Sequence, residues 1–201
     1  MIKKLNKTSE SIESKIHLED NFDIYENAVY LEEYKANIQI FKSIPTLDLG
    51  NIILRGVYPS KLDIEVEMYF HISKREEVKQ YLPEAYVVSK ERAKDKIFEF
   101  IQRMLLNRCL FFCIAEKATK IPLGYVICHS PLVTYKNSNE QIGDWTIDFW
   151  LGKDFEGKGI MGKSLIGILT YLQKMEVPFV FAFVEKRNYK SIKVLEQCQF
   201  L

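Results

Sequence analysis

The sequence predicts a mixed α/β domain in which an antiparallel meander of strands precedes a single βαβ crossover. Strand-like apolar runs at 110–117, 123–130 and 144–151 follow one another with polar turns between them. A glycine-rich loop and an amphipathic helix then separate the third run from a last apolar run at 178–185. Short turns favour antiparallel pairing, whereas a helical connection places the strands that it joins in parallel.

The composition is that of a single globular domain. The chain has 201 residues, of which 47% are hydrophobic and 27% charged, and its formal net charge is +1. So small a net charge provides no general attraction for nucleic acid or for an anionic membrane. No apolar run approaches the roughly 20 residues of a membrane span, and the lysine-rich N-terminus lacks the apolar core of a signal peptide. We therefore expect a cytoplasmic protein whose partners are neither nucleic acid nor membrane.

The four cysteines, Cys109, Cys113, Cys128 and Cys198, are expected to be buried structural thiols. They form no C-x-x-C pair, and no histidine lies at metal-ligand spacing from them, so no metal site is expected. Cys109 and Cys113 lie within the apolar run CLFFCIA, where a free cysteine behaves as a small hydrophobic residue.

An N-terminal extension is expected over residues 1–48, ahead of a domain at 49–201. Residues 1–20 are rich in Ser, Lys and Glu, which is typical of a loose arm or a frayed helix. The apolar residues of the segment 21–44 have both helical and strand-like spacing, so its structure stays open.

Between this extension and the meander, the sequence predicts one strand and three helices. The strand covers residues 51–58. Helices at 60–71 and 73–83 begin with Ser-x-x-Asp and Ser-x-x-Glu, which are typical of a capping box. A longer amphipathic helix at 89–107 begins with a serine suited to an N-cap.

The stretch EGKGIMGKSL, residues 156–165, matches two phosphate-binding patterns. Gly157 to Ser164 reads G-x-x-x-x-G-K-S, the P-loop of nucleotide-binding proteins. A P-loop follows its strand directly and needs several further βα units, whereas residues 152–156 intervene here and a single strand remains. We therefore interpret the P-loop match as accidental, with nucleotide binding as the outlying alternative.

The second pattern is a coenzyme pyrophosphate loop. Gly157 and Gly159 let backbone N–H groups turn toward a pyrophosphate, and a helix starting near Ile160 directs its positive end to the same place. Gly162, in the first turn of this helix, lowers the stability of the helix by about 1 kcal/mol relative to alanine. Close approach of a ligand or of neighbouring backbone would explain it. Glu156 places a carboxylate beside this loop and is expected to point away or to weaken binding.

The element order over residues 51–200 resembles the GCN5-related N-acetyltransferase (GNAT) superfamily, in particular its branch of ribosomal-protein N-terminal acetyltransferases. The motifs that carry the likeness are IDFWLGKDFEGKGIM at 147–161 and NYKSIKVLEQCQF at 188–200. The resemblance implies the acyl-CoA N-acyltransferase fold, acetyl-CoA as cosubstrate, no metal, and an amine acceptor. Glu156 departs from the Gln or Arg that is usual in the family.

The resemblance also implies which residues hold the coenzyme. They belong to the strand at 144–151, the glycine loop and the start of the last helix: Phe149, Trp150, Leu151, Gly157, Lys158, Gly159, Ile160, Met161, Gly162 and Asn188. The alternative for Asn188 is that it is a plain N-cap.

Catalysis in the family is direct attack of the amine on the thioester, which needs a base for the amine and an acid for the thiolate. The candidates are His129 or Asp148 as the base and Ser191 as the acid. His129 is otherwise a polar strand end, and Asp148 otherwise the partner of a nearby lysine or arginine. A non-catalytic module that binds coenzyme A or a protein is the second interpretation of the whole chain.

The acceptor is expected to be a peptide N-terminus or a small amine. Acidic and aromatic residues of the predicted helices would border its site and suit a cation, although solvated helix faces look the same. They are Glu65, Glu67, Tyr69, Glu76, Glu77, Tyr81 and Tyr86, together with the turn at 135–141.

Chains that resemble this family normally continue beyond the last helix with two more strands, a pair that is missing here. Strand 178–184 would then be an uncovered apolar edge, which favours aggregation. We hypothesise that segment 21–44 packs beside it as a hairpin. The alternatives are a helix packed elsewhere, or a partner subunit in a homodimer.

Overall fold

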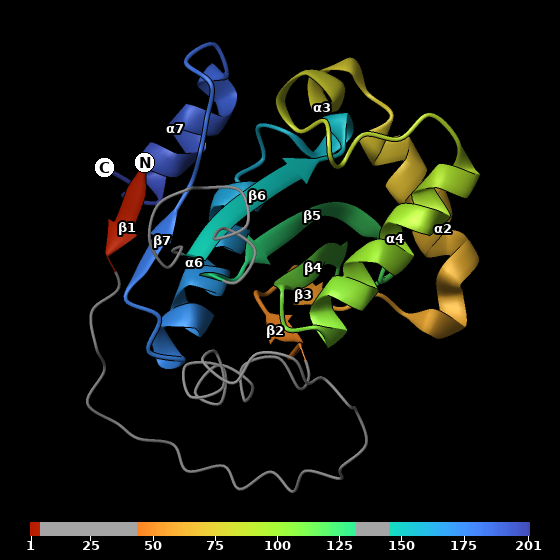
Figure 1. Cartoon of the computed structure of the whole chain (residues 1–201), viewed down its shortest axis with the longest axis horizontal. Coiled ribbons are helices and arrows are strands. Elements are labelled where there is room, and N and C mark those ends of the chain that lie inside the picture. Colours follow the sequence, from red (N-terminus) through yellow and green to blue (C-terminus); the bar gives the residue numbers. More distant parts are fainter. Residues whose placement is uncertain (5–43, 132–144) are drawn as a thin grey trace, which may run out of the picture.

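The structure, a computed structural model, describes residues 1–4, 44–131 and 145–201. Among these residues the strands form one seven-stranded sheet in the order β1-β7-β6-β5-β4-β3-β2 (Figure 1). The strands are β1 Ile2–Lys4, β2 Leu47–Asp48, β3 Ile52–Arg55, β4 Cys109–Glu116, β5 Pro122–His129, β6 Trp145–Leu151 and β7 Phe179–Phe181. The helices are η2 Pro59–Lys61, α2 Leu62–Ser73, α3 Glu76–Tyr81, α4 Lys90–Leu105, η3 Lys153–Phe155, α6 Ile160–Lys174 and α7 Tyr189–Gln197.

The predicted meander and crossover are both confirmed. Strands β2 to β6 pair antiparallel in sequence order, and α6 connects β6 to the parallel strand β7. The parallel pairing is short, because only Trp145 pairs with Val180 and Thr146 with Phe181. Over the rest of β6 no described residue of β7 is its partner, so the sheet opens between the two strands.

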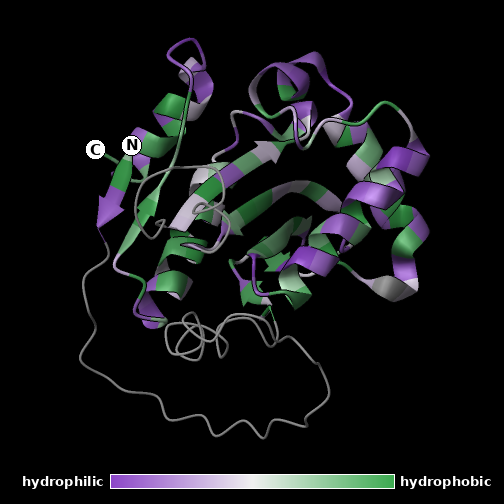
Figure 2. Ribbon diagram, viewed as in Figure 1, coloured by the Kyte–Doolittle hydropathy of each residue, from purple (hydrophilic) through white to green (hydrophobic). Residues whose placement is uncertain are grey.

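Each face of the sheet carries its own hydrophobic core. Alternate residues along a strand point to opposite faces. The strand residues on one face pack against α6 and α7, and this core includes Leu165, Ile168 and Leu172 of α6. Those on the other face pack against α2 and α4, where the rings of Tyr69 and Tyr125 lie 5.0 Å apart. Figure 2 shows the matching apolar stripes on the helices that cover the sheet.

The cysteines are all free and buried, as predicted. Burial raises the pKa of the Cys109 thiol to about 12 and raises the pKa of the Cys128 thiol as well. Such thiols stay protonated at neutral pH and are poor nucleophiles.

Two of the three predicted helix starts are wrong in detail. Lys61 and Arg75 occupy the N-cap positions of α2 and α3, and neither accepts a side-chain capping bond. Ser73 ends α2 in the core, where its hydroxyl accepts a hydrogen bond from Trp150 Nε1. The third start is confirmed, since Ser89 caps α4 by accepting from Arg92 N at 3.2 Å.

The outer edge of β7 is covered by residues 2–4, for which the prediction of a loose arm or a frayed helix is wrong, whereas residues 5–20 lie outside the described residues. β1 pairs antiparallel with β7, and Met1 and Ala182 exchange backbone hydrogen bonds of 2.9 and 2.8 Å. Val180 and Phe181 therefore have paired neighbours on both edges, β1 and β6. The proposed hairpin falls on residues 21–43, which lie outside the described residues, as does the turn at 135–141.

Within the apolar run 178–185, Phe183 is 80% exposed. β7 ends at Phe181, so Phe183 lies beyond the sheet.

Within the described part of the chain, none of the helices combines the length and apolar character needed to cross a membrane.

Candidate functional site

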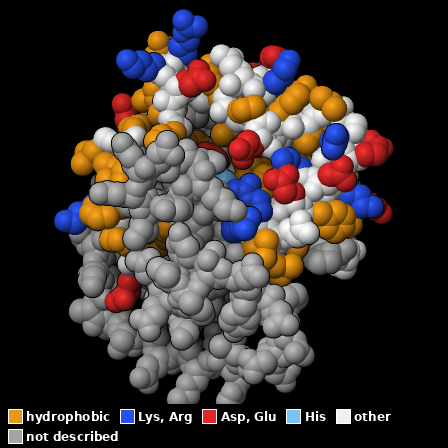
Figure 3. Space-filling view, in the orientation of Figure 1, with side chains coloured by type: hydrophobic (Ala, Val, Ile, Leu, Met, Phe, Trp, Pro, Cys, Tyr) orange, Lys and Arg blue, Asp and Glu red, His pale blue; other side chains and the backbone are white. Residues whose placement is uncertain are grey.

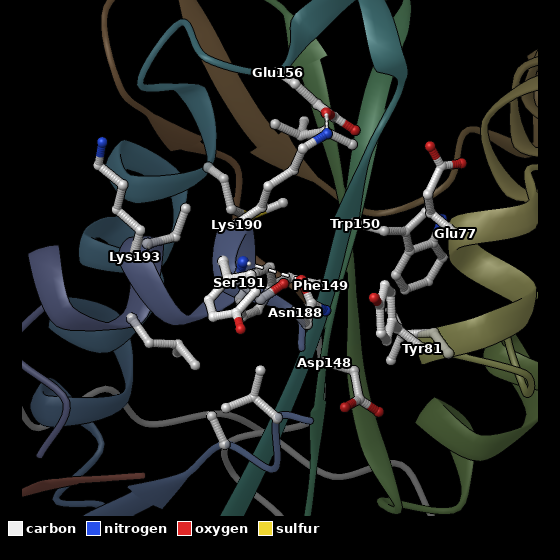
Figure 4. Close-up of a pocket in the computed structure, with 18 of the residues that line it drawn as sticks. Glu77, Tyr81, Asp148, Phe149, Trp150, Glu156, Asn188, Lys190, Ser191 and Lys193 are labelled. Carbon is white, nitrogen blue, oxygen red and sulfur yellow. Dashed lines mark hydrogen bonds and ion pairs between the residues drawn. The ribbon is translucent and has the colours of Figure 1, made fainter. Parts of the chain in front are cut away.

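A cavity of about 950 Å³ lies where β6 and β7 diverge. Its walls come from β6, the glycine loop, the first turn of α6, the segment after β7 and the start of α7. Figure 4 shows Asn188, Lys190, Ser191 and Lys193 on one side of β6, and Asp148, Trp150, Tyr81 and Glu77 on the other. The opening in the sheet thus brings together residues from both of its faces.

The loop before α6 has the backbone shape that a bound phosphate requires. Gly157 and Gly159 have φ of 72° and 73°, in the left-handed region that favours glycine, and a Cβ on either would meet no atom within 4 Å. Gly159 is the N-cap of α6, so the free N–H groups of that helix face the same space. A Cβ at Gly162 also meets nothing within 4 Å. Crowding by neighbouring backbone therefore does not explain why residue 162 is a glycine. The open space beside it leaves room for a ligand.

The side chains of the P-loop match point elsewhere. Lys163 Nζ donates to Asn51 Oδ1 at 3.2 Å, and Ser164 Oγ donates to the carbonyl of Ile160 within its own helix at 2.8 Å. In a P-loop these two side chains would hold phosphates and magnesium. Their engagement here agrees with an accidental match.

Glu156 joins both walls of the cavity instead of pointing away. Arg75 Nη1 donates to Glu156 Oε1 at 2.9 Å, and Lys190 Nζ donates to Glu156 Oε2 at 2.6 Å. Burial alone would raise the pKa of Glu156, but the bonds and charges of Lys190 and Arg75 lower it overall. Arg75 also donates to the carbonyl of Leu151 at 2.7 Å. Sequence reasoning missed Arg75, because no local pattern connects it to residues about 80 positions later.

The two candidate bases are in contact. His129 Nε2 lies 2.8 Å from Asp148 Oδ2, and the side chain of His129 is 10% exposed whereas that of Asp148 is 36% exposed. Asp148 lines the large cavity and also a smaller one of about 170 Å³, which Tyr81, His129 and Trp150 border. Asp148 therefore presents its carboxylate where the two cavities meet.

Asn188 and Ser191 lie across β6 from Asp148 (Figure 4). Asn188 Oδ1 accepts from Ser191 N at 3.2 Å, so Asn188 is the N-cap of α7. Both residues line the large cavity. Contact of Asn188 with the coenzyme and proton donation by Ser191 remain predictions.

The remaining candidates divide between the cavity wall and the core. The expected coenzyme contacts that line the cavity are Phe149, Trp150, Leu151, Gly157, Gly159, Ile160, Met161 and Gly162. Lys158 lies next to them, with its Nζ 5.8 Å from the centre of the Phe155 ring. Of the expected acceptor rim, Tyr81 and Glu77 line it. Glu65 and Tyr69 do not line it, because both are buried. Glu65 forms an ion pair with Arg55, and the hydroxyl of Tyr69 donates to the carbonyl of Ala85. Among the described residues no cluster of three or more metal-ligating side chains is found.

Comparison with known proteins identifies this architecture. The family model described as Acetyltransferase (GNAT) domain matches residues 51–201. No curated protein sequence matches the chain significantly.

Solved structures share the fold at low identity. RimL, a ribosomal L7/L12 alpha-N-protein acetyltransferase in complex with coenzyme A, is 18% identical with a TM-score of 0.63 over 78% of this chain and 84% of that one. The Vibrio fischeri ribosomal-protein-S5-alanine acetyltransferase is 18% identical with a TM-score of 0.59, over 79% and 84% of the two chains. The Salmonella typhimurium acetyl transferase that modifies the N-terminal serine of L7/L12 is 18% identical with a TM-score of 0.62, over 78% and 84%. These values establish the fold.

Proposed function

Because this chain belongs to the acetyltransferase (GNAT) family and is an acetyl-CoA-dependent N-acetyltransferase, we propose that it acetylates a primary amine delivered to Asp148. The acceptor is a peptide N-terminus or a small amine. The observation that carries the proposal is the carboxylate of Asp148, held by His129 at 2.8 Å where the two cavities meet. A carboxylate there attracts a cationic amine and can accept its proton.

The coenzyme side of the cavity supports this assignment. The backbone of Phe149 to Leu151 borders the gap in the sheet, and the open loop at Gly157 and Gly159 would receive the pyrophosphate. Lysines on α7, Lys190 and Lys193, line the same side and supply positive charge. The thioester would then lie beside β6, within reach of an amine held from the opposite side.

The reaction follows from this placement. The cationic amine first passes one proton to Asp148, and its neutral nitrogen then attacks the carbonyl carbon of the thioester. The nitrogen–carbon bond forms and the carbon–sulfur bond breaks. Ser191 donates its hydroxyl proton to the departing thiolate and takes up the second proton that the nitrogen loses. Proton transfer to a well-placed base accounts for about 10²- to 10⁴-fold in rate.

Peptide N-termini are the first acceptors to test. Several solved structures with this fold are named for acetylating ribosomal proteins. The cavity of about 170 Å³ beside Asp148 also offers room for a small side chain next to the amine.

Binding and turnover test the proposal separately. Acetyl-CoA at a hundredfold excess over its Kd adds about 2.7 kcal/mol to the stability, which is a shift of several degrees in Tm, and Mg-ATP should give none. Thiol release should then be measured with a panel of N-terminal peptides and small amines. Asp148→Asn should lower kcat by about 10²-fold or more while leaving the Kd of acetyl-CoA unchanged. An unchanged kcat in this variant would exclude Asp148 as the base.

A further inference from the structure

Arg103, on α4, contacts the histidine that holds Asp148. Arg103 Nη2 lies 2.9 Å from His129 Nδ1, and the Arg103 side chain is only 16% exposed. His129 Nε2 lies 2.8 Å from Asp148 Oδ2 on its other side. Arginine, histidine and aspartate thus form one chain of hydrogen bonds that ends at the cavity.

The direction of these bonds follows from the donors. A guanidinium only donates, so Nδ1 of His129 must accept and cannot carry a hydrogen. The hydrogen of the neutral ring is then on Nε2, which donates to Asp148. With both nitrogens engaged, His129 has no lone pair directed at the amine, and Asp148 keeps its negative charge.

We propose that Arg103 is a positioning residue that holds His129 as the neutral Nε2–H tautomer and thereby keeps Asp148 oriented and ready to accept a proton. This inference rests on the proposed role of Asp148. It also decides between the two candidate bases of the sequence, because a histidine in this arrangement serves the carboxylate and does not itself deprotonate the amine.

The other groups around the histidine are consistent with this arrangement. Glu99 Oε1 and Glu84 Oε2 lie 3.8 and 4.0 Å from Arg103 Nη1 and help to place the guanidinium. Cys109 is the register partner of His129 on β4, and its buried thiol stays neutral. Among the described residues, the charged groups in contact with the imidazole are therefore Arg103 and Asp148.

Loss of Arg103 should allow His129 to take up a second proton. Nδ1 would then be open to protonation, and Asp148 would favour the imidazolium. Asp148 would become a weaker base because an ion pair stabilises its charged form. The acidic limb of the kcat/KM profile of Arg103→Met then follows protonation of His129 instead of Asp148. We therefore expect this limb to move to higher pH, so that activity at mildly acidic pH falls about tenfold more than at alkaline pH.

The nitrogen signals of His129 test the mechanism without any turnover. In the ¹⁵N-histidine spectrum of the whole protein near neutral pH, Nδ1 should appear unprotonated and Nε2 protonated. In Arg103→Met the ring should become doubly protonated at a higher pH than in the parent. Arg92→Met, also on α4 but paired with Asp95 at the surface, is the matched control and should change neither the spectrum nor the pH profile.

Arg103→Lys keeps the positive charge and can still donate an N–H to Nδ1 of His129. It should therefore restore the tautomer and part of the pH profile even if Arg103→Met folds poorly. A protonated Nδ1 in the parent protein, or identical His129 titrations in the parent and in both Arg103 variants, would overturn the inference. Absence of acetyl transfer with the expected tautomer present would instead count against the proposed function.

Discussion

At the scale of single residues, the glycine loop depends on the sign of φ. Gly159 has φ of 73°, and a side chain there would both strain the backbone, by about 1–3 kcal/mol, and fill the open space next to it. We expect Gly159→Val to weaken acetyl-CoA binding about ten- to a hundredfold or more, which corresponds to loss of a single charge-assisted hydrogen bond of about 1.5–3 kcal/mol.

Isothermal titration calorimetry with coenzyme A measures the change. Gly50→Val is the matched control, because Gly50 also has a positive φ, of 86°, but is not among the residues that line the cavity. It should lose stability and keep the coenzyme affinity. Equal affinities for the parent and Gly159→Val would mean that the loop is only a turn.

Glu156 forms ion pairs with two cations at the cavity wall, for which we expect it to compete with the coenzyme. Its carboxylate forms ion pairs with Arg75 and Lys190. A phosphate group of the coenzyme would be attracted to the same two positive charges. Glu156→Gln should therefore bind coenzyme A about two- to fivefold more tightly, in line with about 0.5–1 kcal/mol for a partly exposed ion pair, and with a steeper salt dependence. Glu196→Gln makes the same change of charge on α7 outside the cavity lining and should leave the affinity unchanged. Weaker binding by Glu156→Gln would show that the two ion pairs hold the site in its binding shape.

At the scale of elements, β1 completes the sheet by backbone bonds. Met1 bonds Ala182 of the segment after β7, Ile2 bonds Leu201 on the other side, and Lys3 is opposite Val180. Because bonding direction alternates along an antiparallel strand, Lys3 faces β7 and Lys4 faces away.

Lys3→Pro removes a donor to β7 and should lower the free energy of unfolding by about 1–3 kcal/mol. Lys4→Pro introduces the same ring one residue later and should cost less, since its N–H does not face β7. Urea denaturation compares the two. Similar losses in both variants would indicate that β1 contributes little to the sheet.

The element order was readable from the sequence because its signals are local. Alternating apolar runs predicted β4, β5 and β6, and the serine and asparagine caps of α4 and α7 were found where predicted. The short strands β1 and β2 were missed, because two or three residues contain no period. The capping box of α3 failed because the bond of Ser73 with Trp150 prevailed over local capping, and that of α2 failed because Ser60 lies inside η2.

At the scale of the whole molecule, a buried ion pair joins the sheet to α2, one of the helices that cover it. Arg55, on β3, and Glu65, on α2, are 1% exposed, and their Nη1 and Oε1 are 2.6 Å apart. Arg55→Met leaves the carboxylate buried without its partner and should lower the free energy of unfolding by about 3–5 kcal/mol.

The double variant Arg55→Met/Glu65→Leu removes both charges and should recover most of that loss. Guanidinium unfolding followed by tryptophan fluorescence measures both variants. If the single variant is as stable as the parent, water has replaced the arginine and the pair does not secure α2. On the face shown in Figure 3, acidic and basic side chains are interspersed among the described residues.

The meander, the crossover, the glycine loop and most residues that line the cavity could be predicted from the sequence alone, because periodicity, turn chemistry and motif spacing are properties of neighbouring residues. The tertiary structure decided which charges meet. Arg103 reaches His129 across 26 positions, Arg75 reaches Glu156 across 81, and Met1 reaches Ala182 across 181. Such contacts depend on how helices are placed over a sheet, and no local pattern contains that information. The role of His129 as a support for Asp148 follows from these contacts alone.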